Sequence, residues 1–156
     1  MAPLPCGSDA SEPTDLNQLA RDLVAQQFDG QAVELALDAS LPPLPLDRGR
    51  MQMLVRNLLD NALRHQAGDG PVRLSTVAER DRVLLVVRDR GRGVPTEDLQ
   101  RLAQPFYRPD AARSRGSGGV GLGLYLCRLV AQSHGGALLL RNADPGLEVT
   151  AALPRP

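Results

Sequence analysis

The feature that most constrains this chain is a helical segment that carries two amides inside an otherwise apolar repeat. The segment RNLLDNALRH, residues 56–65, places Asn57 and Asn61 one helical turn apart. Amides on a core helix cost free energy unless a partner satisfies them. Two glycine-rich loops follow, DRGRGVP at 89–95 and GSGGVGLGL at 116–124. Paired amides followed by such loops indicate a bound nucleotide.

Composition indicates one soluble globular domain and argues against several function classes. The chain has 156 residues, of which 42% are hydrophobic and 23% are charged, as in ordinary single domains. A net charge of zero and only 3% aromatic residues argue against nucleic-acid binding. The sequence contains no lysine, which excludes a P-loop and a lysine Schiff base.

The same inventory bears on location and on cysteine chemistry. No apolar run is long enough to cross a bilayer, and the first residues lack the apolar centre of a signal peptide. We therefore expect a cytoplasmic chain that makes no membrane contact. Cys6 and Cys127 provide neither a disulfide framework nor a metal-ligand spacing, and we expect Cys127 to be a small core residue.

Hydrophobic periodicity predicts three substantial helices and about five strands. The helices are expected over residues 14–28, 47–65 and 122–133, with a short additional helix over 96–102. The strands are expected over residues 32–38, 71–79, 82–88, 137–141 and 147–153, with neighbours mostly antiparallel. These elements predict the α/β class and a two-layer sandwich, in which one mixed, largely antiparallel sheet packs against the helices.

Two proline-rich stretches are expected to lie outside these elements. Residues 1–13 are rich in Pro, Gly, Ala and Ser and indicate a disordered lead-in, which leaves 14–156 as the domain. Residues 41–46, LPPLPL, indicate a proline loop, with a polyproline ligand for an adaptor domain as the alternative.

The helix over 47–65 has two distinct faces. Asp47 is expected to cap it, and its apolar positions are spaced as one helical stripe: Met51, Leu54, Val55, Leu58, Leu59 and Ala62. A second row, roughly a third of a turn away, is polar: Asn57, Asn61, Arg64 and His65. One face thus packs, and the face beside it offers amides and cations.

Each motif allows a ligand role and a structural alternative. Amide oxygens of Asn57 and Asn61 could hold Mg²⁺ together with phosphates, or they could cap loops and bond across the core. Asp89 at a strand end could accept a hydrogen bond from the exocyclic amine of adenine. Gly91 and Gly93 would let the backbone approach a flat base; the alternative is a simple tight turn.

The second glycine run fits the dinucleotide-binding pattern G-x-G-x-x-G, with Asp144 as the acidic residue that follows. That pattern requires a buried strand directly before the glycines, and the segment RPDAARSR is not one, so this interpretation is disfavoured. A loop leading into a helix N-terminus, where free N–H groups hold phosphates, fits better. Arg108, Arg113 and Arg115 would add positive charge there, or form a solvated loop. We expect His134 to belong to the helix stop.

Taken together, the chain resembles the catalytic ATP-binding domain of sensor histidine kinases, whose Bergerat fold is shared with gyrase, heat-shock chaperone and mismatch-repair ATPases. The resemblance covers about residues 15–154 and rests on four motifs in order. They are RNLLDNALRH as the asparagine box, DRGRGVP as the first glycine box, QPFYRPD as the phenylalanine box and GGVGLGLYLCRLVAQSHGG as the second glycine box.

The resemblance implies ATP and Mg²⁺ as cofactors and assigns roles by position. Asn57 and Asn61 would hold Mg²⁺ and the phosphates. Arg64 and His65, which stand where the family usually has lysine and often tyrosine, would lie beside the nucleotide. Asp89 would bind the adenine amine, in a pocket shaped by Gly91 and Gly93. The remaining ATP-binding positions belong to the lid that folds over the phosphates: Phe106, Arg108, Gly119, Val120, Gly121, Leu122 and Gly123.

The resemblance also implies a histidine protein kinase. Hydrolysing relatives carry a water-activating glutamate where this chain has Asn57, and an amide is no general base. No histidine precedes His65, so the phosphoacceptor would lie on a separate dimerisation domain, with a response regulator as the indirect partner. We expect little transfer by this chain alone, and a parent protein anchored in the inner membrane. The alternatives are an anti-sigma-type serine kinase, a non-catalytic module of the same fold and a gyrase-like ATPase.

Overall fold

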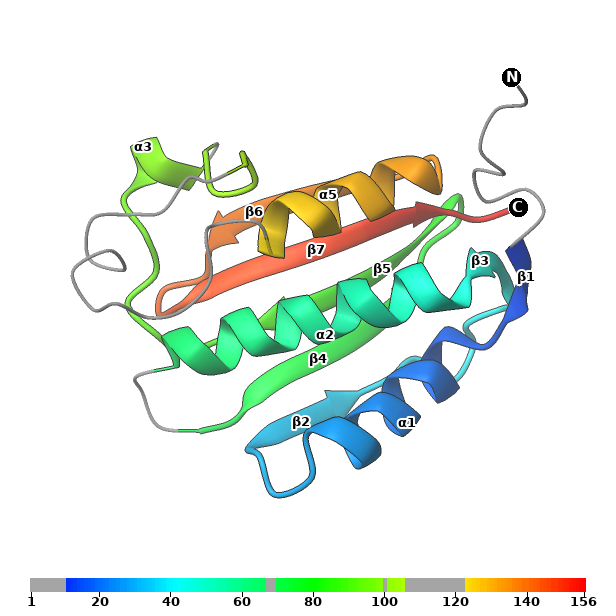
Figure 1. The fold of residues 1–156 in the computed structure, drawn as a ribbon, viewed down its shortest axis with the longest axis horizontal. Coiled ribbons are helices and arrows are strands. Elements are labelled where there is room, and N and C mark those ends of the chain that lie inside the picture. Colours follow the sequence, from blue (N-terminus) through cyan, green and yellow to red (C-terminus); the bar gives the residue numbers. More distant parts are fainter. Residues whose placement is uncertain (1–10, 67–69, 100, 106–122) are drawn as a thin grey trace.

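The computed structural model describes residues 11–66, 70–99, 101–105 and 123–156. Its elements are β1 (Ser11–Thr14), α1 (Leu16–Gln27), β2 (Val33–Ala36), β3 (Leu44–Asp47), α2 (Arg48–His65), β4 (Val72–Ala78), β5 (Arg82–Arg88), α3 (Thr96–Leu99), α5 (Gly123–Ser133), β6 (Ala137–Asn142) and β7 (Leu147–Pro154). A five-stranded sheet of order β2-β4-β5-β7-β6 forms one layer, and α1, α2 and α5 lie across one of its faces (Figure 1). Among the described strands of this sheet, β2 and β4 pair in parallel and the other neighbours pair antiparallel, so the predicted mixed, largely antiparallel sandwich is confirmed.

The central helix α2 begins and packs as its sequence predicts. Asp47 is the N-cap, and its Oδ1 accepts the Arg50 backbone N–H at 3.1 Å. All six apolar positions of the predicted stripe are at most 3% exposed. Burying a leucine-sized side chain contributes about 1.5–3 kcal/mol, so this stripe holds α2 against β4 and β5. The rotation of α2 about its own axis is thereby fixed, and with it the direction in which the polar row faces.

The predictions for residues 11–13 and 44–46 are wrong. Ser11–Thr14 and Leu44–Asp47 pair antiparallel as a two-stranded ribbon, where a lead-in and a proline loop were expected. Leu44 and Leu46 alternate onto the core face and are buried, which argues against an exposed polyproline ligand. Pro13 lies opposite Pro45, a position open to proline because both strands of a ribbon are edges. Residues 1–10 lie outside the described part.

The described elements of the C-terminal half agree with the prediction, except that α3 ends at Leu99 and residues 101–103 form turns, where the helix was expected to continue to 102. Cys127 of α5 is buried against α2, where its Sγ lies 3.5 Å from the Leu54 carbonyl oxygen. Burial raises the pKa of this thiol to about 12, because a thiolate would be poorly solvated there. The predicted core role of Cys127 is confirmed.

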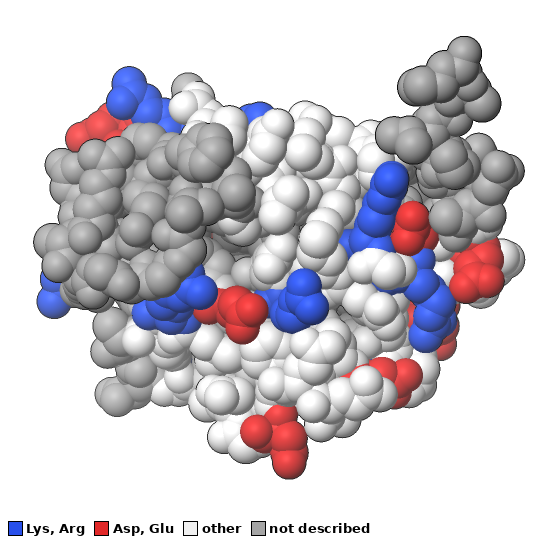
Figure 2. All heavy atoms as spheres, viewed as in Figure 1, with Lys and Arg blue, Asp and Glu red and all other residues white. Residues whose placement is uncertain are grey.

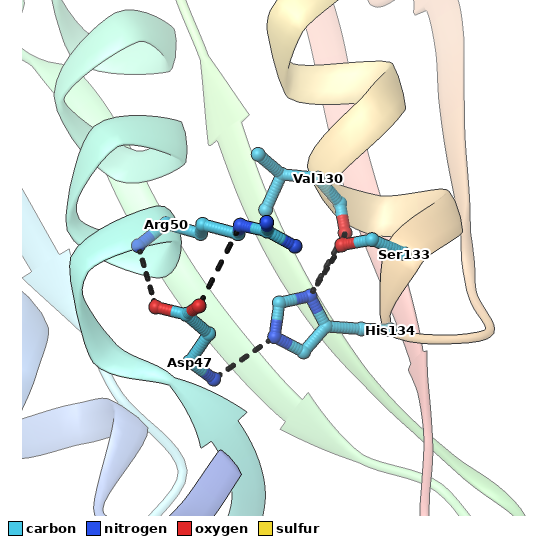
Figure 3. Close-up of polar contacts among 5 residues, drawn as sticks. All are labelled: Asp47, Arg50, Val130, Ser133 and His134. Carbon is cyan, nitrogen blue, oxygen red and sulfur yellow. Dashed lines mark hydrogen bonds and ion pairs between the residues drawn. The ribbon is translucent and has the colours of Figure 1, made fainter. Parts of the chain in front are cut away.

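His134 joins the end of α5 to the start of α2 (Figure 3). Its Nε2 accepts the backbone N–H of Asp47 at 3.0 Å, and its Nδ1 lies 2.8 Å from the Val130 carbonyl oxygen. Because Nε2 accepts, the ring proton belongs on Nδ1, where it is donated to Val130. The helix stops here, with Gly135 in the left-handed region at φ +78°. His134 therefore belongs to the helix stop, as expected, and also ties two elements together.

Candidate functional site

The two amides of α2 are partly exposed side chains on its polar row. Asn57 and Asn61 are both half-buried. Within the described ranges, neither side chain makes a hydrogen bond or caps a loop. The structural alternative, amides bonded across the core, is thus not observed in this part of the chain. Arg64 and His65 follow in the last turn and are exposed.

Asp89 lies just beyond the end of β5 and is 2% exposed. Its Oδ1 accepts two backbone N–H groups, from Gly91 at 2.8 Å and from Leu147 at 3.2 Å. No described residue donates a hydrogen bond to Oδ2 or forms an ion pair with this carboxylate. A buried carboxylate with one oxygen engaged retains strong capacity to accept from a ligand.

Gly91 lies where the loop after Asp89 touches the end of α2. A Cβ at Gly91 would overlap the backbone carbonyl oxygen of His65. Only glycine permits this approach, so His65 contributes its backbone to the loop's position. Gly93 adopts φ +72°, and a Cβ there would lie 2.5 Å from Oδ1 of Asn142, so a side chain is excluded on two counts.

The loop is also held by side chains that the sequence did not single out. On the α2 side, Oε1 of Gln66 accepts the Arg90 backbone N–H at 2.7 Å. On the opposite side, the Asn142 amide accepts the Val94 N–H at 2.9 Å and donates to the Val94 carbonyl at 2.7 Å. The end of β6 therefore reaches a loop some fifty residues earlier in the chain.

Gly146 of that turn packs directly behind Asp89. A Cβ at Gly146 would overlap the Asp89 carbonyl oxygen, and Asp89 donates its own N–H to the Leu147 carbonyl at 3.1 Å. The dipeptide Pro145-Gly146 signals a turn in the sequence. Periodicity carries no information on where such a turn packs, so its contact with the site could not be predicted.

The predicted phosphate-binding region is described only at its end. Gly123 is the first residue of α5 and is exposed, and a Cβ there would meet no atom within 4 Å. The other predicted lid residues lie outside the described residues: Phe106, Arg108, Gly119, Val120, Gly121 and Leu122. Arg113 and Arg115 lie outside them as well.

The helix-bearing face of the domain carries charges of both signs. On the helix-bearing face, basic and acidic side chains are interspersed with uncharged ones (Figure 2). In the described ranges, no group of three or more His, Cys, Asp and Glu side chains is arranged to hold a metal ion. Among the helices of the described part, none is long and apolar enough to cross a membrane.

Comparison with known proteins decides the family. Residues 46–156 match the model of the histidine kinase-, DNA gyrase B- and HSP90-like ATPases. The chain belongs to this family. Its matched region begins in β3 and includes the whole of α2, the Asp89 loop and the β6–β7 turn, and therefore every element of the site described above.

Sequence relatives of the kinase catalytic domain are sensor proteins. This chain is 40% identical over 115 residues to the alginate biosynthesis sensor protein KinB of Pseudomonas aeruginosa, and the match covers 74% of this chain and 18% of KinB. It is 33% identical over 111 residues to the sensor protein SrrB of Staphylococcus aureus, covering 70% of this chain and 19% of SrrB. The chain thus spans about a fifth of the length of these curated relatives.

Solved structures agree with this assignment. The histidine kinase domain of the E. coli osmosensor EnvZ is 31% identical, with a TM-score of 0.70, and the match covers 93% of this chain and 89% of that one. Full-length ShkA in complex with AMPPNP is 26% identical, with a TM-score of 0.78, covering 93% of this chain and 31% of ShkA. The chain is a catalytic domain of the sensor histidine kinase type.

Proposed function

We propose that this domain binds Mg²⁺ and ATP and presents the γ-phosphate to a histidine on a separate dimerisation and phosphoacceptor domain of a longer sensor kinase. A response regulator would then receive the phosphoryl group. The observation that carries the proposal is the buried Asp89 carboxylate, whose Oδ1 accepts two backbone N–H groups while Oδ2 accepts none from the described residues. The complex of the related kinase ShkA with AMPPNP supports a nucleotide as the ligand.

The base would be recognised at Asp89. Oδ2 would accept a hydrogen bond from the exocyclic amine of adenine, while the two backbone donors hold Oδ1 in place. Gly91 and Gly93 carry no side chain beside this carboxylate, and the backbone there can approach a planar ring. A bond to a charged acceptor contributes about 1.5–3 kcal/mol, enough to distinguish an amine from a carbonyl at the same ring position.

The phosphates would lie along the polar row of α2. The half-buried amides of Asn57 and Asn61 have no partner among the described residues, and amide oxygens suit Mg²⁺ when phosphate oxygens complete its shell. When bound, Mg²⁺ would neutralise charge on the transferring phosphate. Arg64 and His65 would flank the triphosphate, and the exposed N-terminus of α5 at Gly123 would contribute N–H groups.

The lid completes the proposed site. Phe106 would anchor the lid, and Arg108 would add positive charge to it. The segment that would fold over the phosphates comprises Gly119, Val120, Gly121, Leu122 and Gly123. The chemistry would be transfer rather than hydrolysis, because the amide of Asn57 cannot take a proton from water. Catalysis would rest on positioning and on charge neutralisation. We place the domain in the cytoplasm, in a parent protein anchored in the inner membrane.

A transfer experiment tests the proposal against its alternatives. The domain is incubated with labelled Mg·ATP and a separately produced helical domain that carries the phosphoacceptor histidine. We expect label on that partner that is lost in acid and retained in base, as phosphohistidine is. Acid-stable label would favour the serine kinase, steady-state release of phosphate without a partner would favour the ATPase, and absence of nucleotide binding would favour a non-catalytic module.

A further inference from the structure

The segment 90–95 between Asp89 and α3 has no regular secondary structure, so its backbone groups need partners from elsewhere in the fold. Val94 finds both of its partners in one side chain. Asn142 accepts the Val94 N–H at 2.9 Å and donates to the Val94 carbonyl at 2.7 Å. A single side-chain amide thus pairs with one residue as a neighbouring strand would.

Asn142 is itself held rigidly. It is the last residue of β6 and lies opposite Leu147 in the pairing with β7. Leu147 donates its N–H to Oδ1 of Asp89 at 3.2 Å. The two register partners therefore hold the two ends of the same loop, Leu147 at Asp89 and Asn142 at Val94, and the separation of those ends is set by the sheet.

Gly93 of this loop lies in close contact with Asn142 and Gly146. A Cβ at Gly93 would lie 2.5 Å from the Asn142 Oδ1 and 3.3 Å from the Gly146 carbonyl oxygen. The loop therefore lies directly against the end of β6 and the turn that follows it. Loss of the Asn142 amide would leave the Val94 N–H and carbonyl without their partners and free the far end of the loop, while the Leu147 bond to Asp89 remains.

We propose that Asn142 is a positioning residue that fixes the width of the base pocket between Asp89 and Val94, and thereby sets discrimination between purines. The inference rests on the proposed function, since it assumes that Asp89 receives a base. With the loop fixed, a base with a carbonyl in place of the amine is forced against the Asp89 carboxylate. With the loop released, that base can move away from the carboxylate, and discrimination falls.

ADP and inosine diphosphate test this directly, because their bases differ in having an amine or a carbonyl at position 6. Their dissociation constants are measured by calorimetry with Mg²⁺ for the wild type, N142L and N142D. Leucine is of similar size and has neither donor nor acceptor, whereas aspartate keeps the acceptor and loses the donor. R141A is the matched control, because Arg141 neighbours Asn142 on β6 and pairs with Glu148 at the surface.

We expect the ratio of the two dissociation constants, inosine diphosphate over ADP, to fall about tenfold in N142L, which corresponds to a loss of about 1.4 kcal/mol of discrimination. It should also fall in N142D and stay unchanged in R141A. A ratio is insensitive to the fraction of folded protein, so N142D decides the matter if N142L does not fold.

Equal weakening of both nucleotides, or an unchanged ratio in both Asn142 variants, would overturn the positioning role while leaving nucleotide binding intact. Failure of the wild type to bind ADP would instead overturn the proposed function, and with it this inference. The two failures are therefore distinguishable in one set of titrations.

Discussion

Replacing Asp89 by asparagine changes one atom that faces the proposed base and preserves the loop. Oδ1 of Asp89 accepts the N–H groups of Gly91 and Leu147. Because only an oxygen can accept both, the asparagine side chain must place its carbonyl oxygen at the Oδ1 position. Its NH₂ group then occupies the Oδ2 position, where a donor would face the adenine amine, which is also a donor.

The magnitude follows from the bond that is lost. A hydrogen bond to a charged acceptor contributes about 1.5–3 kcal/mol, which corresponds to a rise of about 10- to 150-fold in the dissociation constant for ADP. The two backbone bonds that stabilise the loop remain, so thermal stability should change little. Inosine diphosphate should weaken less or bind more tightly, because its carbonyl can accept from the new NH₂ group.

Calorimetric titration of the wild type and D89N with ADP and inosine diphosphate measures both effects, and circular dichroism melting checks the fold. An ADP dissociation constant in D89N equal to that of the wild type would refute the assignment of Asp89 to the base. A parallel loss for both nucleotides with a lowered melting temperature would show that the carboxylate acts only as loop support.

Three further changes test the packing that positions the site. G91A should lower the melting temperature, because the new Cβ overlaps a backbone carbonyl oxygen. G123A should leave the melting temperature unchanged or raise it, because its Cβ meets no atom within 4 Å. Equal effects of the two variants would contradict the close approach of Gly91 to the end of α2. With Cys6 replaced by serine, the Cys127 thiol should resist a thiol reagent at pH 8 until urea unfolds the domain, because burial raises the pKa of this thiol to about 12. Rapid reaction of the thiol in the folded protein would contradict its burial. H134A should lower the free energy of unfolding by about 1–3 kcal/mol in urea denaturation, because it leaves the Asp47 backbone N–H without its partner. An unchanged free energy of unfolding would show that this bond between α5 and α2 does not stabilise the fold.

The sequence predicts α2 almost residue for residue, because a long amphipathic stripe with an aspartate cap leaves one packing solution. Its buried positions from Met51 to Ala62 and its N-cap Asp47 agree with the structure. The polar row beside the stripe follows from the same geometry. The first glycine box follows β5 directly and forms the loop at Asp89, whereas most of the second lies outside the described residues.

The ribbon and the loop clamp could not be predicted, because they depend on pairings between distant segments. Ser11–Thr14 has no strand pattern of its own and becomes a strand only by pairing with Leu44–Asp47. Asn142 is one polar residue at a strand end, and its role depends on the β6–β7 register that brings it to Val94. Hydrophobic periodicity reports the face of an element and not its partner.

Direct titration is the best test of whether this chain binds an adenine nucleotide together with magnesium. The wild-type domain is titrated with AMPPNP by calorimetry, first with Mg²⁺ and then with EDTA. We expect saturable binding of one nucleotide per chain, clearly weaker when the metal is removed. An absence of binding heat and of any nucleotide-dependent rise in melting temperature, with the domain folded, would contradict nucleotide binding by this domain.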